Sequence, residues 1–368
     1  GEDALATMEA FRLMGVEMEG PDDGRVTVRG VGIDGLQPPS KVIDCGNSGT
    51  TMRLLTGILA GQRFGSELVG DESLMRRPMN RVALPLRQMG AKVMTAEGGR
   101  PPVMIEGSAK LTGINYAMPV ASAQVKSALL LAGLYARGRT CITEPAPTRD
   151  HSERMLTCFG YSVRRDGAVA CVEGGGRLTA TTIDIPGDIS SAAFLLAAAA
   201  IVPGSRVLIP SVGVNPGRTG ILDVLRHMGQ SGGLRLHNGR LANGEPVADI
   251  EIAHTPLQGV AISAQDVPAM IDELPVIAVL ATQAEGITEV RGAAELRVKE
   301  TDRIATTVEE LRRMGANIEA LPDGFVVEGP TPLHGSHVSS HGDHRLAMAL
   351  AVAALAADGE TTIEDTTC

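Results

Sequence analysis

The sequence contains no tryptophan, and only 2% of its 368 residues are aromatic. Few rings are therefore available to stack against the bases of single-stranded nucleic acid. The formal net charge of −10 is also unfavourable for a partner whose backbone is a chain of phosphates. Both features predict that nucleic acid is not a partner.

Long apolar runs are missing as well. No stretch approaches the roughly 20 apolar residues of a membrane span, and no basic-then-apolar leader opens the chain. We therefore expect a cytoplasmic protein with no membrane partner. Hydrophobic residues at 43% and charged residues at 21% fit a globular protein, and the length favours two domains.

Several chemical motifs are absent too. The chain has no Walker loop, no G-x-G-x-x-G before a helix, no G-x-S-x-G elbow, and no His or Cys pair with metal-ligand spacing. We expect neither a metal nor an organic cofactor. The cysteines include no C-x-x-C pair, so we predict reduced, mostly buried thiols. They are Cys45, Cys141, Cys158, Cys171 and Cys368.

What the chain does contain is a repeat. A leucine-rich helix pattern that closes on Met-Gly or Phe-Gly occurs five times, and each glycine predicts a left-handed helix end. Its copies are Leu5–Gly15, Val82–Gly90, Glu153–Gly160, Ile221–Gly229 and Val308–Gly315. A second, alanine-rich helix follows each copy, over Thr50–Ala60, Ala121–Ala136, Ser190–Ile201, Glu273–Ala284 and Asp343–Ala357.

Strands between these helices make the protein α/β. Ser66–Val69 and Thr140–Thr143 are examples, and a further strand is expected at Thr182–Ile185. The natural division places one domain at residues 1–186 and the second at 187–368. One more helix at each end would complete six units, so we expect the chain to be incomplete at both ends. The pattern leaves open whether the units form one sheet or a symmetric ring.

The alanine-rich helices begin with small or hydrogen-bonding residues, most clearly in the stretch Asn47–Arg53. Cations lie near these helix starts, where they oppose the helix dipole unless an anion joins them. They are Arg53, Arg77, Lys126, Arg149, Lys299, Arg303 and Arg345. These cations have two interpretations. Either they form a shared anion site, or they are solvated side chains on ordinary capped helices.

Three further features have two interpretations each. The charged run Arg297–Arg303 is either a solvated first helical turn or a cation face with Glu300 as a proton donor or acceptor. Asp272 is a helix cap or an acid that takes a proton from a substrate hydroxyl. His344 is a proton carrier or a satisfied core residue.

Seven motifs in order resemble the 5-enolpyruvylshikimate-3-phosphate synthase family over the whole chain. They are GNSGTTMR, GDESLMRRPM, PVASAQVKSALLLAGL, TRDHSERML, GDISSAAFLLAAA, RVKETDR and GDHRLAMA. The resemblance implies an inside-out α/β barrel with two domains of three βαβαββ-type units each, the first and last incomplete. It also implies helix N-termini that face an interdomain cleft. We expect a monomer.

The resemblance also implies an activity and its residues. The enolpyruvyl group of phosphoenolpyruvate is transferred to the 5-hydroxyl of shikimate 3-phosphate, and phosphate is released. By similarity, shikimate 3-phosphate is held by Ser122, Ala123, Gln124, Thr148, Arg149, Asp272 and Lys299. Phosphoenolpyruvate is held by Asn47, Gly49, Thr50, Arg77, Arg303, His344 and Arg345, with Arg53 in support. Asp272 acts on the 5-hydroxyl and Glu300 protonates the methylene carbon, so that Asp272, Lys299, Glu300 and His344 form the catalytic group.

Departures from the family pattern leave two other outcomes open. The family's first-helix Lys-Ser and its C-terminal Lys are absent, which makes a fragment that binds shikimate 3-phosphate without turnover one alternative. The other is a UDP-N-acetylglucosamine enolpyruvyl transferase, although Glu72 stands where that family has a reactive Cys. Glyphosate is a possible inhibitor. Gly49 leaves room for it, and the run Gly70–Ser73 lacks the Lys of the tolerant subclass, so tolerance stays open.

Overall fold

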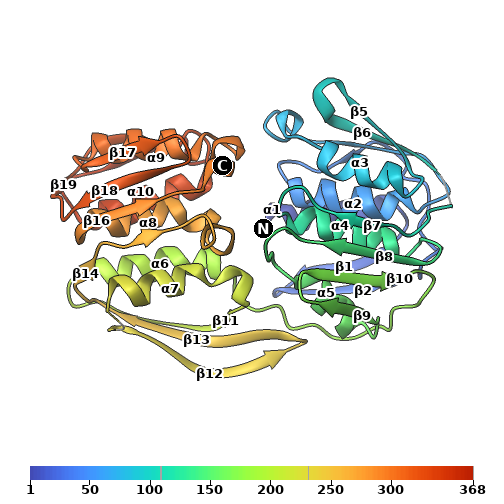
Figure 1. The fold of residues 1–368 in the computed structure, drawn as a ribbon, viewed down its shortest axis with the longest axis horizontal. Coiled ribbons are helices and arrows are strands. Elements are labelled where there is room, and N and C mark those ends of the chain that lie inside the picture. The colour runs from blue at the N-terminus through green and yellow to red at the C-terminus, as the bar shows by residue number, and fades with distance from the viewer. Residues whose placement is uncertain (108–109, 231, 368) are drawn as a thin grey trace. The chain divides into compact units, whose positions relative to one another are not determined.

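The computed structural model describes residues 1–107, 110–230 and 232–367. Contacts divide the chain into two compact units, Gly1–Thr182 (unit 1) and Ile183–Cys368 (unit 2). Each unit has a hydrophobic core of its own. Figure 1 shows the elements of both units, labelled where there is room; the units are described separately below.

Unit 1 repeats one supersecondary pattern. Its helices are α1 (Glu2–Leu13), α2 (Gly49–Ala60), α3 (Asn80–Gln88), α4 (Ala123–Gly133) and α5 (His151–Cys158). Its strands are β1 (Glu17–Asp22), β2 (Arg25–Arg29), β3 (Ile43–Asp44), β4 (Ser66–Val69), β5 (Lys92–Ala96), β6 (Arg100–Glu106), β7 (Asn115–Ala117), β8 (Arg139–Thr143), β9 (Val163–Asp166) and β10 (Val169–Glu173). Helix α2 connects the parallel strands β3 and β4, and helix α3 then leads into the antiparallel pair β5 and β6. The order β7, α4, β8, α5, β9, β10 repeats this arrangement.

Unit 2 follows the same order. Its helices are α6 (Ile189–Ile201), α7 (Gly220–Met228), α8 (Leu274–Thr282), α9 (Arg303–Arg313) and α10 (His344–Ala354). Its strands are β11 (Arg206–Gly213), β12 (Leu234–Ala242), β13 (Glu245–Ala253), β14 (Leu257–Gln258), β15 (Ala261–Ile262), β16 (Ala284–Val290), β17 (Ile318–Leu321), β18 (Gly324–Gly329), β19 (Leu333–His334), β20 (His337–Ser339), β21 (Ala357–Asp358) and β22 (Thr362–Glu364). Strands β14 and β15 pair in parallel with β16 across helix α8, and β19 and β20 pair in parallel with β21 and β22 across helix α10.

The alanine-rich helices form the inside of each unit. Every residue of α8 is buried, which suits a helix that is apolar all round. Helix α8 contacts α6 and α10, and in unit 1 helix α2 contacts α4. The inside-out α/β fold that the family resemblance implies is therefore confirmed, with helices at the centre of each unit and sheets around them.

The ten predicted helices correspond to α1 through α10. Four of the five predicted left-handed ends are present, at Gly15, Gly90, Gly160 and Gly315, where φ lies between +76° and +95°. Gly229 is the exception, because its φ is −85° and the positive φ falls on Gln230. That prediction was wrong for one helix, whose turn is one residue longer.

Two other expectations from the sequence need correction. Residues 182–185 form no strand, and the chain runs there in irregular, mostly exposed backbone. Cys141 and Cys171 form a disulfide because the register of β8 and β10 places them directly opposite each other, with Cα atoms 4.1 Å apart. Cys45 is a buried free thiol whose pKa burial raises to about 12, and Cys158 is free as well. Cys368 lies outside the described residues.

No helix in the described ranges has the length and apolar character that crossing a membrane requires.

Candidate active site

In unit 1, the N-termini of two inner helices lie next to each other. Ser48 caps α2 by accepting a bond from the Thr51 backbone N–H, and Ser122 caps α4 by accepting one from the Val125 N–H. Both caps follow from hydroxyl residues placed just before the first helical turn. They leave the remaining backbone N–H groups of these first turns available to an anion.

Gln124 joins the two helix starts. Its Oε1 accepts a bond of 2.7 Å from Arg53 Nη1, and its Nε2 donates to Thr50 Oγ1 at 2.9 Å. Gly49 lies beside this group, and a Cβ there would be 2.7 Å from Arg53 Nη1 and 3.3 Å from Arg77 Nη1. The glycine therefore lets both guanidinium groups approach the start of α2.

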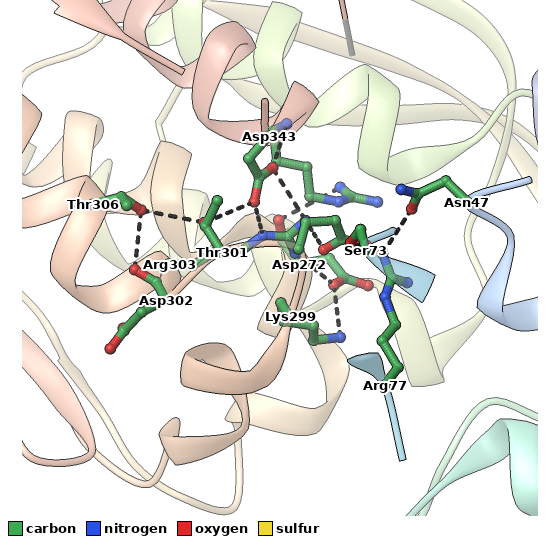
Figure 2. A network of polar contacts seen from close by, with 12 residues as sticks. Asn47, Ser73, Arg77, Asp272, Lys299, Thr301, Asp302, Arg303, Thr306 and Asp343 are labelled. Atoms are coloured by element: carbon green, nitrogen blue, oxygen red, sulfur yellow. Dashed lines mark hydrogen bonds and ion pairs between the residues drawn. The ribbon is translucent and has the colours of Figure 1, made fainter. Parts of the chain in front are cut away.

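The loop before α2 is tied to the loop before α3. Arg77 donates through Nη2 to Asn47 Oδ1 at 2.7 Å, and Asn47 Nδ2 donates to Asp71 Oδ2 at 2.6 Å. Arg77 also bonds to Ser73, as Figure 2 shows. Asn47, Gly49, Thr50, Arg53, Arg77 and Gln124, all predicted from the sequence, thus gather at one place in unit 1.

The second predicted group of unit 1 follows strand β8. Thr148 and Arg149 lie in the loop of residues 144–150, and both are half-buried. Lys126 departs from the expectation of a cation directed at a ligand. Its side chain is 0% exposed, and its Nζ forms ion pairs with Glu144 and Glu153.

In unit 2, the predicted acids and cations form a single network (Figure 2). Asp272, in the short 3-10 turn Ile271–Glu273 before α8, accepts from Lys299 Nζ at 3.2 Å and from Arg303 Nη1 at 3.3 Å. Two cations therefore flank this one carboxylate. Asp272 stays 16% exposed, so a ligand can reach it.

Arg303 is the centre of this network. Its Nε donates to Asp343 Oδ2 at 2.7 Å, and its Nη2 donates to Glu300 Oε2 at 2.6 Å. The guanidinium is 2% exposed and Asp343 is 0% exposed. Burial alone would lower the pKa of Arg303, but the carboxylates of Asp343, Glu300 and Asp272 raise it above its ordinary value. This residue is therefore not part of a solvated helical turn, although α9 begins at it.

The first turn of α10 adds two further predicted residues. Arg345 Nη1 donates to the Asp272 backbone carbonyl at 3.5 Å and lies 3.7 Å from Glu273 Oε1. His344 is exposed, which excludes a core role. Although the residue as a whole is exposed, the imidazole loses part of its hydration to the surrounding protein; this desolvation, followed by the positive charge of Arg345, lowers the pKa of His344, so the imidazole is neutral near pH 7.

In this network the carboxylates of Asp272, Glu300 and Asp343 surround Arg303, and Lys299 pairs with Asp272. Arg345 contacts the Asp272 backbone carbonyl and Glu273. Carboxylates that remain partly exposed, at Asp272 and Glu300, can exchange a proton with a bound molecule. Lys299 and Arg345 are exposed by 28% and 16%, so they can contact a phosphate or carboxylate. The geometry suits proton transfer to and from an anionic substrate.

Several acidic residues of these networks were not predicted as site residues. Asp71 holds Asn47, and Asp343 holds Arg303 while capping α10 through the Arg345 N–H. Glu273 is buried, which raises its pKa, and it accepts a bond from Ser190. The available signal at Asp71 and Asp343 was an aspartate directly after a glycine, where a cap is common.

Comparison with known proteins gives one consistent result. The family model for EPSP synthase (3-phosphoshikimate 1-carboxyvinyltransferase) matches residues 1–368. A protein named 3-phosphoshikimate 1-carboxyvinyltransferase from Alkalilimnicola ehrlichii is 56% identical over 365 residues, covering 99% of this chain and 81% of the relative. One of the same name from Methylococcus capsulatus is 54% identical, covering 99% and 83%. The solved structure of EPSP synthase from Acinetobacter baumannii has a TM-score of 0.88 at 49% identity, covering 100% of this chain and 84% of the other.

Proposed function

The chain belongs to the EPSP synthase family, and from this membership we propose the reaction and the residue roles that follow. The protein transfers the enolpyruvyl group of phosphoenolpyruvate to the 5-hydroxyl of shikimate 3-phosphate, a step in aromatic amino-acid biosynthesis. The proposed residue roles rest on one observation: the Arg303 guanidinium donates hydrogen bonds to the carboxylates of both Asp272 and Glu300.

The reaction has two proton-transfer steps. The 5-hydroxyl oxygen adds to C2 of phosphoenolpyruvate and loses its proton, while C3 gains one and becomes a methyl group. The tetrahedral adduct then loses phosphate from C2 and a proton from C3, which restores the double bond. A base near the hydroxyl and an acid near C3 are sufficient for this sequence.

Asp272 accepts the hydroxyl proton in this proposal, since its carboxylate is partly exposed and Lys299 and Arg303 hold it in place. Glu300 delivers the proton to C3, and Lys299 contacts shikimate 3-phosphate. Arg303, His344 and Arg345 contact phosphoenolpyruvate, whose carboxylate and phosphate suit forked guanidinium groups. Neutral His344 contributes a hydrogen bond rather than a charge.

Unit 1 contributes the remaining substrate contacts. We assign Ser122, Ala123, Gln124, Thr148 and Arg149 to shikimate 3-phosphate, because capped helix starts and an arginine suit a phosphate. Asn47, Gly49, Thr50 and Arg77 are assigned to phosphoenolpyruvate, with Arg53 in support. Glyphosate inhibition, a monomeric state and a cytoplasmic location are further parts of the proposal.

The overall proposal is tested by phosphate release and calorimetry together. Phosphate should be released from phosphoenolpyruvate only when shikimate 3-phosphate is present, and shikimate 3-phosphate should bind alone. Binding without turnover would support the alternative of a non-catalytic binding protein. If shikimate 3-phosphate does not bind and no phosphate is released, the assigned activity is refuted for this chain.

Lys299→Met should weaken the binding of shikimate 3-phosphate by about 10- to 100-fold, because a charge-assisted contact to the substrate is lost. Calorimetric titration measures this change. The matched control is Lys92→Met, which removes an exposed lysine paired with Glu106 and should leave affinity unchanged. Unchanged affinity in Lys299→Met would remove Lys299 from the site.

Glu300→Gln should lower kcat by about 10²- to 10⁴-fold with little change in substrate affinity, since the amide cannot deliver a proton. Steady-state kinetics and titration of both substrates separate the two effects. Glu309→Gln is the control, because Glu309 is an exposed glutamate on the adjacent helix. A near-normal rate in Glu300→Gln would refute the proton-transfer role.

A further inference from the structure

Unit 1 contains a fully buried charge cluster with no role in the reaction described above. Lys126, on α4, lies 3.0 Å from Glu144 Oε2 and 2.8 Å from Glu153 Oε1. The three side chains are 0%, 4% and 2% exposed. Charged groups are rarely buried so completely unless they are paired.

The cluster connects three segments. On α4, Lys126 lies about one turn after the capping residue Ser122 and two residues after Gln124. Glu144 directly follows strand β8, and Glu153 is on α5. Helix α4 contacts both β8 and α5, all of which are labelled in Figure 1. Lys126 therefore joins the helix that carries proposed substrate contacts to the start of the loop of residues 144–150.

The two glutamates differ in what else they hold. Glu144 accepts a hydrogen bond from the Thr148 hydroxyl through Oε1, while its Oε2 accepts from Lys126. Both carboxylate oxygens of Glu153 are buried, and in the described part of the chain neither forms a hydrogen bond apart from its ion pair with Lys126. Of the two glutamates, it is thus Glu144 that connects the buried lysine to Thr148 in the loop.

We propose that Glu144, anchored by Lys126, is a positioning residue that holds the loop of residues 144–150 so that Thr148 and Arg149 meet shikimate 3-phosphate. The inference rests on the proposed function, because it takes Thr148 and Arg149 as contacts of that substrate. The far end of the loop is held separately, since Asp150 accepts from Arg154 Nε at 2.7 Å and also pairs with Arg165. Glu144 is therefore the residue that holds the loop at Thr148.

Charge balance supplies a matched pair of variants. One ammonium group faces two carboxylates, so removing either glutamate leaves a one-to-one buried ion pair. Glu144→Met and Glu153→Met delete the same group at equal burial, but only Glu144→Met removes the bond to Thr148. A role that is merely structural would affect both variants alike.

The experiment measures the Kd of shikimate 3-phosphate by calorimetry in the full chain, together with the KM of phosphoenolpyruvate. Glu144→Met should raise that Kd about fivefold to tenfold, the size expected for a lost hydrogen bond that orders the loop, without changing the KM of phosphoenolpyruvate. Glu153→Met should stay within about twofold of the unmodified protein. Equal effects of the two variants, or none in Glu144→Met, would overturn the inference.

Two further measurements keep the inference falsifiable. Hydrogen exchange of the peptide spanning residues 144–150 should speed up in Glu144→Met and not in Glu153→Met, in the absence of any substrate. In a Thr148→Val background, Glu144→Met should raise the Kd less than twofold further, because the two groups act as a unit. Additive effects would refute action through Thr148.

The outcomes also separate this inference from the proposed function. If the unmodified chain binds shikimate 3-phosphate and Glu144→Met binds it equally well, only the positioning role is refuted. If the unmodified chain does not bind shikimate 3-phosphate, the proposed function is refuted and this inference falls with it.

Discussion

At the scale of single residues, Asp343 is the buried counter-ion of the Arg303 guanidinium. Burial by itself would raise the pKa of Asp343, but its ion pair with Arg303 outweighs burial and lowers that pKa below the ordinary value of 3.8. A lowered pKa in the folded state means that the ionised form stabilises the fold. That contribution is fully present above pH 3.8 and is lost as the pH falls through the lower, folded-state pKa.

Asp343→Asn should therefore lower the free energy of unfolding at pH 7 by about 3 kcal/mol, because it leaves Arg303 buried with one carboxylate fewer. The difference from the unmodified protein should shrink as the pH falls below about 4. Urea unfolding at several pH values measures both. Glu309→Gln, which alters an exposed pair with Arg313, is the control. Equal stability of Asp343→Asn and the unmodified protein at pH 7 would contradict this account.

At the scale of elements, the inner helices depend on small residues. A Cβ at Gly57, on α2, would lie 2.2 Å from the backbone oxygen of Ala128 on α4. No side chain can occupy that position unless one of the two helices moves. This close approach is the physical reason for a glycine at this position of α2.

Gly57→Ala tests this packing, because the two accounts predict opposite signs for the change in stability. Helix propensity alone predicts that alanine stabilises α2 by about 1 kcal/mol. Overlap with the α4 backbone predicts a net loss of about 1 to 3 kcal/mol. Thermal unfolding distinguishes the two, with Gly30→Ala as the control because a Cβ at Gly30 meets no atom within 4 Å. A gain in Tm for Gly57→Ala would show that the helices are not this close.

At the scale of the whole molecule, the chain consists of two units that each have a hydrophobic core. The segment of residues 177–182 is exposed and has no regular secondary structure, so it suits a connection between separately folding units. A unit with its own core can bury its apolar side chains without the other unit.

Residues 1–182 and residues 183–368, produced as separate chains, should each fold. Circular dichroism should show helical content and a cooperative thermal transition for both, because the cores share no residues. The intact protein melted under the same conditions is the reference. A separate unit that lacks a cooperative transition would show that its core needs the other unit.

The sequence by itself determined the elements and their repetition. Helix periodicity, capping residues at Ser48, Ser122 and Asp343, and terminal glycines depend on neighbours within about four positions, so the ten helices could be located without a structure. The family resemblance carried the assignment of activity, and the roles of individual site residues stay predictions.

Tertiary structure decided which distant side chains meet. Arg303 lies between Asp343, 40 positions away, and Asp272, 31 positions away, and Lys126 meets Glu144 across 18 positions. The same holds for the disulfide, since Cys141 and Cys171 are 30 positions apart and meet only through the register of β8 and β10. Local periodicity specifies which face of an element is apolar, whereas long-range contacts depend on topology and strand register, which no local pattern encodes.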